Sequence, residues 1–307
     1  MCDIGSNNDT KSLFDNWKTD NCIDTKQWIH ILKQIHINKV HIIGIEPLLY
    51  KDFNNLIEQI HKLNIKITLT TNGFLYEKYQ QSIIKYCDLI WVSIDGFKEE
   101  THDYYRGVMG SYKKAIYCIN HLKEHNKNVQ ISSCILPNNI QEIPLLDKLM
   151  WDKNIPIVFN HLNFIHPLSS PSQQLCSNLK YIDLKDYNID MLYESIKSCN
   201  KNSIFSPNLI TKKEIDTYYN TIPTRCVIKK SGCKVINELV LKKRFIINAN
   251  GDLLLGNKCW INLKLGNVLE YLKDTNKQNK VRKISDNIKT NGFSPLCQRL
   301  CCGGKLI

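Results

Sequence analysis

The sequence lacks both long apolar runs and a secretion signal. No stretch of about 18 consecutive apolar residues occurs in the 307-residue chain, so no membrane-spanning helix is predicted. The first residues, Met1-Cys2-Asp3-Ile4, have neither the basic start nor the apolar centre of a signal peptide. We also find no internal repeat. These absences predict a cytoplasmic protein without a membrane partner.

A regular disulfide framework is missing too, although cysteine is plentiful. The chain has 13 cysteines, and a secreted protein with so many would show a signal peptide and an ordered cysteine pattern. Thiolates kept for metal or redox chemistry fit this count better. Cys87 and Cys118 are different, because each lies in an apolar, helix-like stretch where a small buried side chain is expected.

Positive charge is in excess, with a formal net charge of +12. Such a balance can indicate a nucleic-acid partner or an anionic substrate. Here the lysines are spread along the whole chain, and Asn and Ile are abundant as well. Compositional drift explains that mixture without a dedicated basic face. Nucleic acid is therefore not expected as a partner, and a nucleic-acid modifier stays an alternative that rests on charge alone.

Helical and strand patterns alternate from residue 25 to residue 161. Helices are predicted at 25–35, 52–63, 77–86, 111–124 and 143–151, and strands at 39–43, 65–70, 89–93, 129–136 and 157–161. This alternation predicts an α/β fold with a parallel sheet covered by helices. Folds of this kind carry their chemistry at the carboxyl ends of the strands.

The last third of the chain has a different character. A helix is predicted at 187–198, a β-hairpin at 244–255 with its turn at Asn250-Gly251, and a further helix near 269–284. A cysteine-dense tail follows. We therefore predict two domains, with a barrel in residues 1–200 and a small C-terminal α+β cysteine-rich module in residues 201–307.

Three polar motifs follow successive predicted strands. They are Ile43-Gly44-Ile45-Glu46-Pro47, Thr70-Thr71-Asn72-Gly73, and Ser93-Ile94-Asp95-Gly96 with Thr101-His102-Asp103 and Arg106-Gly107 after it. Each motif alone is an ordinary strand end. Together they bring a hydroxyl, carboxylates, an amide and a guanidinium to one barrel mouth. This set suits a zwitterionic ligand that bears a ribose, with Arg106 able to bind its carboxylate by two hydrogen bonds.

The order G-x-E-P-L-L, T-N-G, S-I-D-G, T-H-D, R-G resembles the radical S-adenosylmethionine (SAM) superfamily over roughly residues 1–165. The resemblance implies a partial (β/α)6 barrel and a [4Fe-4S] cluster held by three cysteines. It also implies SAM as the cofactor, which is reductively cleaved to a 5′-deoxyadenosyl radical that abstracts hydrogen from a substrate. A reductant such as flavodoxin or ferredoxin is then an expected partner.

The resemblance also implies which residues bind the cofactor. Gly44, Ile45 and Glu46 match the segment that holds the methionine amino group, although Ile45 replaces a glycine of the family pattern. The other matching positions are Ser93 and Arg106 for the ribose or carboxylate, Asn72 and Asp95 near the cofactor, and Met1 beside the adenine. For Asp95, a role in stabilising the turn is an equal alternative.

The start of the chain departs from the family pattern. The family's cluster loop reads C-x-x-x-C-x-(aromatic or Met)-C, and Cys2 falls where its third cysteine is expected. We therefore expect a barrel lacking its first strand and two cluster ligands. Either Met1 is encoded by an internal methionine codon of a longer reading frame, or the protein is a relative that has lost its cluster. One thiolate cannot hold a cluster that needs three, so the 307 residues alone are not expected to be active.

The C-terminal cysteines resemble the SPASM or twitch extension of many radical SAM proteins. The resemblance implies an auxiliary iron–sulfur cluster on Cys226, Cys259, Cys297 and Cys301, with Cys302 or Cys233 as substitute ligands. A zinc site with the same four ligands is an alternative, and free thiols are another.

Function follows from the resemblance only in outline. The chain is predicted to be a radical SAM enzyme that acts on a peptide or a small molecule, with a preference for peptide modification. The alternative from another class is a cluster-less binding or scaffold protein. The substrate itself is not predicted, because fold and cofactor do not determine it.

Overall fold

The computed structural model describes residues 23–35, 37–44, 46–161, 186–206, 208–209, 211–221, 245–247, 252–255 and 263–274. Among these, residues 37–221 belong to one compact unit, and residues 23–35 together with 245–274 belong to a second. The first unit therefore continues past residue 200, and residues 23–35 group with residues 245–274. The boundary at residue 200 stays a prediction.

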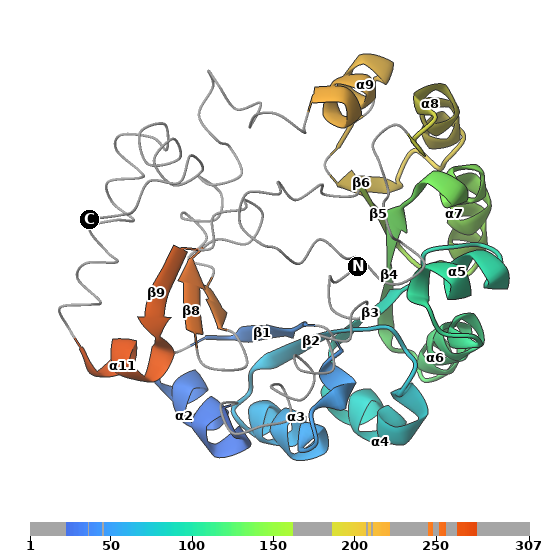
Figure 1. Ribbon diagram of the computed structural model, residues 1–307. Helices are drawn as coiled ribbons and strands as arrows, with labels where there is room; N and C mark the ends of the chain where they lie inside the picture. The colour runs from blue at the N-terminus through green and yellow to red at the C-terminus, as the bar shows by residue number, and fades with distance from the viewer. Residues whose placement is uncertain are drawn as a thin grey trace. The chain divides into compact units, whose positions relative to one another are not determined.

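The first unit is built on a parallel sheet of six described strands in the order β1-β2-β3-β4-β5-β6 (Figure 1). The strands are β1 (Lys39–Ile42), β2 (Lys66–Thr71), β3 (Leu89–Ser93), β4 (Asn128–Ile135), β5 (Ile157–His161) and β6 (Ile204–Ser206). Because each pair of neighbouring strands is parallel, the carboxyl ends of all six strands lie along one edge of the sheet.

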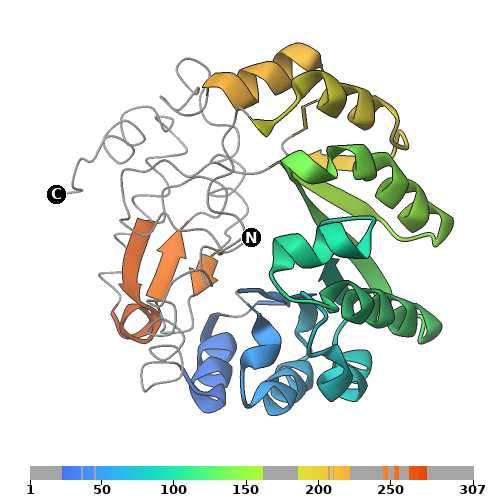
Figure 2. The same ribbon diagram turned by 45° about the vertical axis from the view of Figure 1, so that its right-hand side comes forward.

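Helices connect the strands and lie along one face of the curved sheet (Figures 1 and 2). They are α3 (Phe53–Lys62), α4 (Tyr76–Tyr86), α5 (Glu99–Arg106), α6 (Ser111–Glu124), α7 (Ile143–Asp152), α8 (Ile189–Lys197) and α9 (Lys212–Thr221). Two short 3₁₀ helices, η1 (Pro47–Leu49) and η2 (Pro137–Glu142), follow β1 and β4. None of the helices in the described ranges is long and apolar enough to cross a membrane.

Side chains alternate between the two faces of the sheet. Ile90, Val92 and Ile131 are fully buried on the face that meets the helices. Ser93, paired in register with Ser132, is only half-buried and points to the opposite face. This inner face carries hydroxyl and amide side chains near the carboxyl edge, so a polar wall lines the concave side of the sheet.

The predicted α/β class and each strand predicted between residues 39 and 161 are confirmed, with bounds shifted by at most one residue. Helices α5 and α9 and strand β6 were not predicted. The expected lack of a first barrel strand concerns the segment before Cys2 and stays a prediction, since residues 1–22 lie outside the described residues.

The second unit contains helix α2 (Thr25–Ile35), strands β7 (Phe245–Ile247), β8 (Asp252–Leu255) and β9 (Leu263–Asn267), and helix α11 (Val268–Lys273). Strands β7 and β8 pair antiparallel, which confirms the predicted hairpin. Its turn at Asn250-Gly251 is not among the described residues. Ile31 of α2 is fully buried in an apolar cluster with Ile23 and Val268, so α2 and α11 share one core.

Candidate functional site

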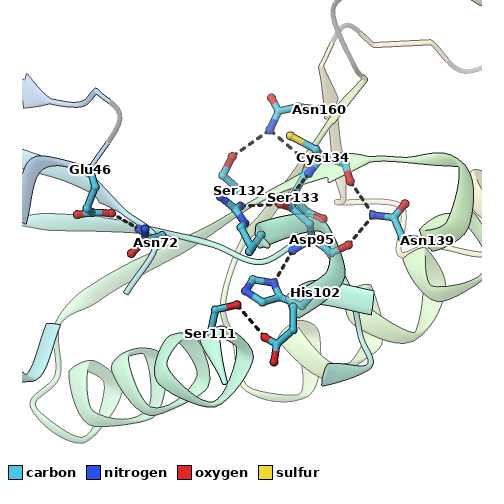
Figure 3. Close-up of polar contacts among 12 residues, drawn as sticks. Glu46, Asn72, Asp95, His102, Ser111, Ser132, Ser133, Cys134, Asn139 and Asn160 are labelled. Atoms are coloured by element: carbon cyan, nitrogen blue, oxygen red, sulfur yellow. Dashed lines mark hydrogen bonds and ion pairs between the residues drawn. The ribbon is translucent and has the colours of Figure 1, made fainter. Parts of the chain in front are cut away.

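Polar groups at the carboxyl edge of the sheet bond to one another and not only to solvent (Figure 3). Glu46 follows β1, Asn72 follows β2, Asp95 follows β3, and Asn139 lies in η2 after β4. Because the strands are parallel neighbours, these residues meet at one edge. The three strand-end motifs are thus brought together as predicted from their positions.

Glu46 ties the end of β1 to the end of β2. Its side chain is 5% exposed and accepts hydrogen bonds from Thr71 Oγ1 at 2.8 Å, the Asn72 amide at 2.7 Å and the Leu48 amide at 3.1 Å. Burial raises the pKa of the Glu46 carboxyl, and these hydrogen bonds oppose the rise. Both carboxylate oxygens therefore hold the backbone of the first two strand ends in place.

Asp95 ties β3 to β4 and to helix α5. Its carboxylate is fully buried, accepts the Cys134 amide at 2.8 Å, and lies 2.6 Å from Nη2 of Arg106. Its own amide donates to Nδ1 of His102 at 3.1 Å, and its carbonyl accepts Asn139 Nδ2 at 2.6 Å. Asp95 is therefore the centre of a network that fixes the third strand end.

His102 must be neutral to accept the Asp95 amide through Nδ1. Burial, reinforced by the positive charge of Arg106, lowers the pKa of His102 to about 4. The imidazole is 1% exposed and stays an acceptor at neutral pH. Its second nitrogen then carries the proton.

Arg106 ends helix α5 and presents donors that the described protein does not use. Gly107 follows it in the left-handed conformation, φ 68°, and closes the helix with a hydrogen bond from its amide to the Asp103 carbonyl. Asp103 in turn accepts hydrogen bonds from Ser111 Oγ at 2.7 Å and the Tyr112 amide at 2.8 Å, which fixes the following loop. Within the described residues, the buried Nε of Arg106 has no hydrogen-bond partner.

That unused donor bears on what the site can bind. A guanidinium with one nitrogen on Asp95 and another N–H free can bind a carboxylate of a ligand at the strand ends. Ser93 adds a half-buried hydroxyl on the inner face of the sheet. No atom of the described residues lies within 4 Å of the position that a Cβ on Gly44 would take. These residues fit an amino-acid ligand.

Three further residues lie on the inner face of β4 and β5. Asn160 Nδ2 donates to Ser132 Oγ at 3.0 Å, and Cys134 is the register partner of Asn160 (Figure 3). These residues and Asn139 were missed in the sequence, and His102 was named only as part of a motif, without a role of its own. The only sequence signal was the alternation of polar and apolar residues in β4, which places Ser132 and Cys134 on one face.

The other predicted site residues lie outside the described residues. They are Met1, Cys2, Ile45, Cys226, Cys233, Cys259, Cys297, Cys301 and Cys302. Within the described part of the chain, no three His, Cys, Asp or Glu side chains come together as a metal site. Cys87 and Cys118 are buried, which agrees with their predicted structural role. The roles assigned to Gly44, Glu46, Asn72, Ser93, Asp95 and Arg106 in cofactor binding stay predictions.

The six-stranded parallel sheet and its surrounding helices define the class first: an α/β fold of the kind in which ligands bind at the carboxyl ends of the strands. Residues 2–150 match the family model described as the radical SAM superfamily. The chain therefore carries a radical SAM domain. Members of this family use SAM and a [4Fe-4S] cluster.

Known proteins agree with this assignment. The chain is 30% identical over 122 residues to Fe-coproporphyrin III synthase of Methanosarcina barkeri, which is 39% of this chain and 30% of that protein. It is 27% identical over 105 residues to the antilisterial bacteriocin subtilosin biosynthesis protein AlbA of Bacillus subtilis, which is 33% of this chain and 23% of that protein. The matched part is thus less than a third of each relative.

A solved structure extends the likeness over more of the fold. Streptococcus suis SuiB bound to precursor peptide SuiA superposes with a TM-score of 0.54 at 21% identity, covering 86% of this chain and 61% of that one. At this identity the likeness shows the fold alone.

Proposed function

We propose that this protein is a radical SAM enzyme that modifies a peptide. The observation that carries the proposal is the ordered carboxyl edge of the sheet, where Arg106 is held by Asp95 and keeps a buried donor without a partner in the described residues. This geometry lies within a domain that matches the superfamily. The alternative, a scaffold protein without a cluster, is not favoured, because the relatives are enzymes.

The residues of the site have separate tasks in this proposal. Arg106 binds the carboxylate of SAM, Ser93 contacts its ribose, and the backbone at Gly44–Glu46 receives its amino group. Asn72 lies beside the cofactor, and Glu46 keeps the Gly44–Glu46 segment against β2. When bound with a [4Fe-4S] cluster, SAM supplies hydrogen-atom abstraction.

The cluster ligands belong to the proposal as well. Cys2 is assigned to the [4Fe-4S] cluster, and Cys226, Cys259, Cys297 and Cys301 or Cys302 to an auxiliary iron–sulfur cluster. A flavodoxin or ferredoxin would supply electrons in the cytoplasm.

A peptide substrate is supported by the relatives. AlbA takes part in bacteriocin biosynthesis, and the SuiB structure contains a precursor peptide. The inner wall of the sheet is compatible with this, because Ser132 and Asn160 present the hydroxyl and amide groups that pair well with peptide bonds.

Anaerobic reconstitution tests the reaction. Iron and sulfide per chain are measured, and 5′-deoxyadenosine is quantified after reduction with SAM present. For the form that includes the upstream reading frame, we expect bound iron and SAM-dependent 5′-deoxyadenosine, and at least a tenfold loss in Arg106→Ala, since a charge-assisted pair contributes about 1.5–3 kcal/mol. The protein is tested both with Met1 as its first residue and with the upstream reading frame included. Failure of both forms to bind iron and SAM contradicts the proposal.

The substrate class is tested in cells. Small-peptide fractions from cells that express the wild type or Arg106→Ala are compared by mass spectrometry. Peptides whose mass changes only with the wild type support a peptide substrate. An unchanged peptide fraction from an enzyme that cleaves SAM would point to a small molecule instead.

A further inference from the structure

The Asp95–Arg106 pair places two opposite charges in contact at the ligand edge. Asp95 is 0% exposed and Arg106 is 21% exposed, and their nearest atoms are 2.6 Å apart. The second carboxylate oxygen of Asp95 accepts the Cys134 amide. The buried carboxylate thus has one hydrogen bond and one ion-pair contact, and the opposite charge of Arg106 compensates for its removal from water. The pair therefore has no net charge.

The groups packed around this pair add no positive charge at neutral pH. His102 is neutral, because its Nδ1 accepts the Asp95 amide and its pKa lies well below the usual value. Asp103 on the same helix is occupied by Ser111 and by the backbone of the next loop. Glu46 acts on Arg106 from the neighbouring strand end and can only add negative charge.

The charge of the expected ligand makes this balance important. SAM carries a sulfonium, an ammonium and a carboxylate, and so has a net charge of +1. An unpaired guanidinium would attract the carboxylate but repel the other two groups. A guanidinium that is already paired keeps its N–H donors while its charge is cancelled.

We propose that Asp95 is a positioning residue that cancels the charge of Arg106, so that the strand-end site binds a carboxylate belonging to a ligand of net positive charge. This inference rests on the proposed function and adds a reason for ligand selectivity. It assigns Asp95 to the site through Arg106 and not through direct contact with the cofactor.

A purely structural Asp95 makes a different prediction. Asn in its place can still accept the Cys134 amide through its carbonyl oxygen, so the turn would survive. What Asn cannot do is balance the guanidinium. The two roles are therefore separated by a measurement that responds to ligand charge and not to fold.

The experiment compares SAM with S-adenosylhomocysteine, which keeps the amino-acid and nucleoside parts but lacks the sulfonium charge. Dissociation constants are measured by equilibrium dialysis with the reconstituted full chain. We expect Asp95→Asn to weaken SAM about fivefold more than S-adenosylhomocysteine, as one added charge near the site would do at an effective dielectric of about 20–40. The excess should shrink at high salt.

Two further variants make the result specific. The double variant Asp95→Asn with Arg106→Gln removes both charges and should return the ratio of the two constants to the wild-type value, although both ligands bind more weakly. Asp103→Asn is the matched control, because it removes a buried carboxylate of the same helix that has no arginine partner among the described residues. Its ratio should stay at the wild-type value.

The outcomes are distinguishable. Equal weakening of both ligands in Asp95→Asn would overturn the inference and leave Asp95 a turn residue. Failure of the wild type to bind either ligand would instead contradict the proposed function. If Asp95→Asn does not fold, Asp95→Ser serves as a second neutral variant. The ratio of its two dissociation constants can be measured even if only part of the protein is folded, because unfolded chains reduce the number of binding sites and leave the dissociation constants of the folded chains unchanged.

Discussion

Single polar residues at the strand ends are used mainly to hold other parts of the protein. Glu46 bonds to β2, and Asp95 bonds to β4 and α5. The sequence indicated that these residues meet at one edge. It could not indicate their pairing, because Asp95 meets Asn139 across 44 positions and a hydrogen-bond partner at that distance leaves no periodic pattern.

His102 makes the stability of this network depend on pH. Its pKa in the folded state is about 4, below the ordinary value of 6.5, so the unfolded chain binds the proton more tightly. The contribution of neutral His102 to the free energy of unfolding is fully present above pH 6.5. It is lost as the pH falls toward 4, and the loss reaches about 3 kcal/mol. Urea unfolding between pH 7 and pH 4.5 measures this loss.

The variant His102→Asn isolates the contribution. Its side-chain oxygen can accept the Asp95 amide without titrating, so the acid-induced loss should be smaller than in the wild type. His125, which is exposed and lies outside this network, provides the matched control His125→Asn. An acid loss that is equal in all three proteins would show that His102 does not titrate as described.

At the scale of elements, strands were predicted well and the short connecting pieces were not. In the strands of the first unit, apolar residues either alternate with polar ones or form a short continuous run. Such patterns are enough to locate strands in a sequence. Helix α5 has eight residues, seven of them charged or aromatic, and no apolar stripe, so its pattern is weak. Its position depends on the Asp95–Arg106 pair and on the Gly107 cap, which are tertiary and local backbone effects.

Asn139 joins η2 to two strand ends and should be sensitive to substitution. Its Nδ2 donates to the carbonyls of Asp95 and Cys134, and its Oδ1 accepts the Leu136 amide at 2.8 Å. Asn139→Asp replaces the donor with an oxygen that faces two carbonyls, and we expect the free energy of unfolding to fall by about 3 kcal/mol.

Chemical denaturation of Asn139→Asp measures that fall. Asn138→Asp is the control, because Asn138 is the neighbouring residue and is exposed. It should change the free energy of unfolding by less than about 0.5 kcal/mol. A similar small effect at both positions would mean that the Asn139 hydrogen bonds contribute little.

At the scale of the whole molecule, the grouping of the chain was the least predictable feature. Helix α2 was predicted with its correct bounds, and Asp24 before it accepts the Gln27 amide through Oδ1 at 2.7 Å. That it packs with α11, more than two hundred residues later, could not be read from a pattern. Its apolar stripe shows only that a partner exists.

Substitution of Ile31 tests this grouping. Ile31 is 0% exposed within the cluster shared with Val268, so Ile31→Asp buries a charge there and should loosen α2 and α11 together. Hydrogen exchange read by mass spectrometry should show loss of protection in both helices while β3 and β4 remain protected. Lys33→Asp, at an exposed position of α2, should leave exchange unchanged. Loosening of α2 alone would contradict the shared core.

The shared core of α2 and α11 has a consequence for how the protein is made. Synthesis runs from the N-terminus, so α2 leaves the ribosome long before its partner exists. At about 5–20 residues per second, the wait is on the order of ten seconds or more, during which the six-stranded sheet encoded between them can form. The apolar side of α2, with Ile31 at its centre, is a surface that a chaperone can bind during this wait.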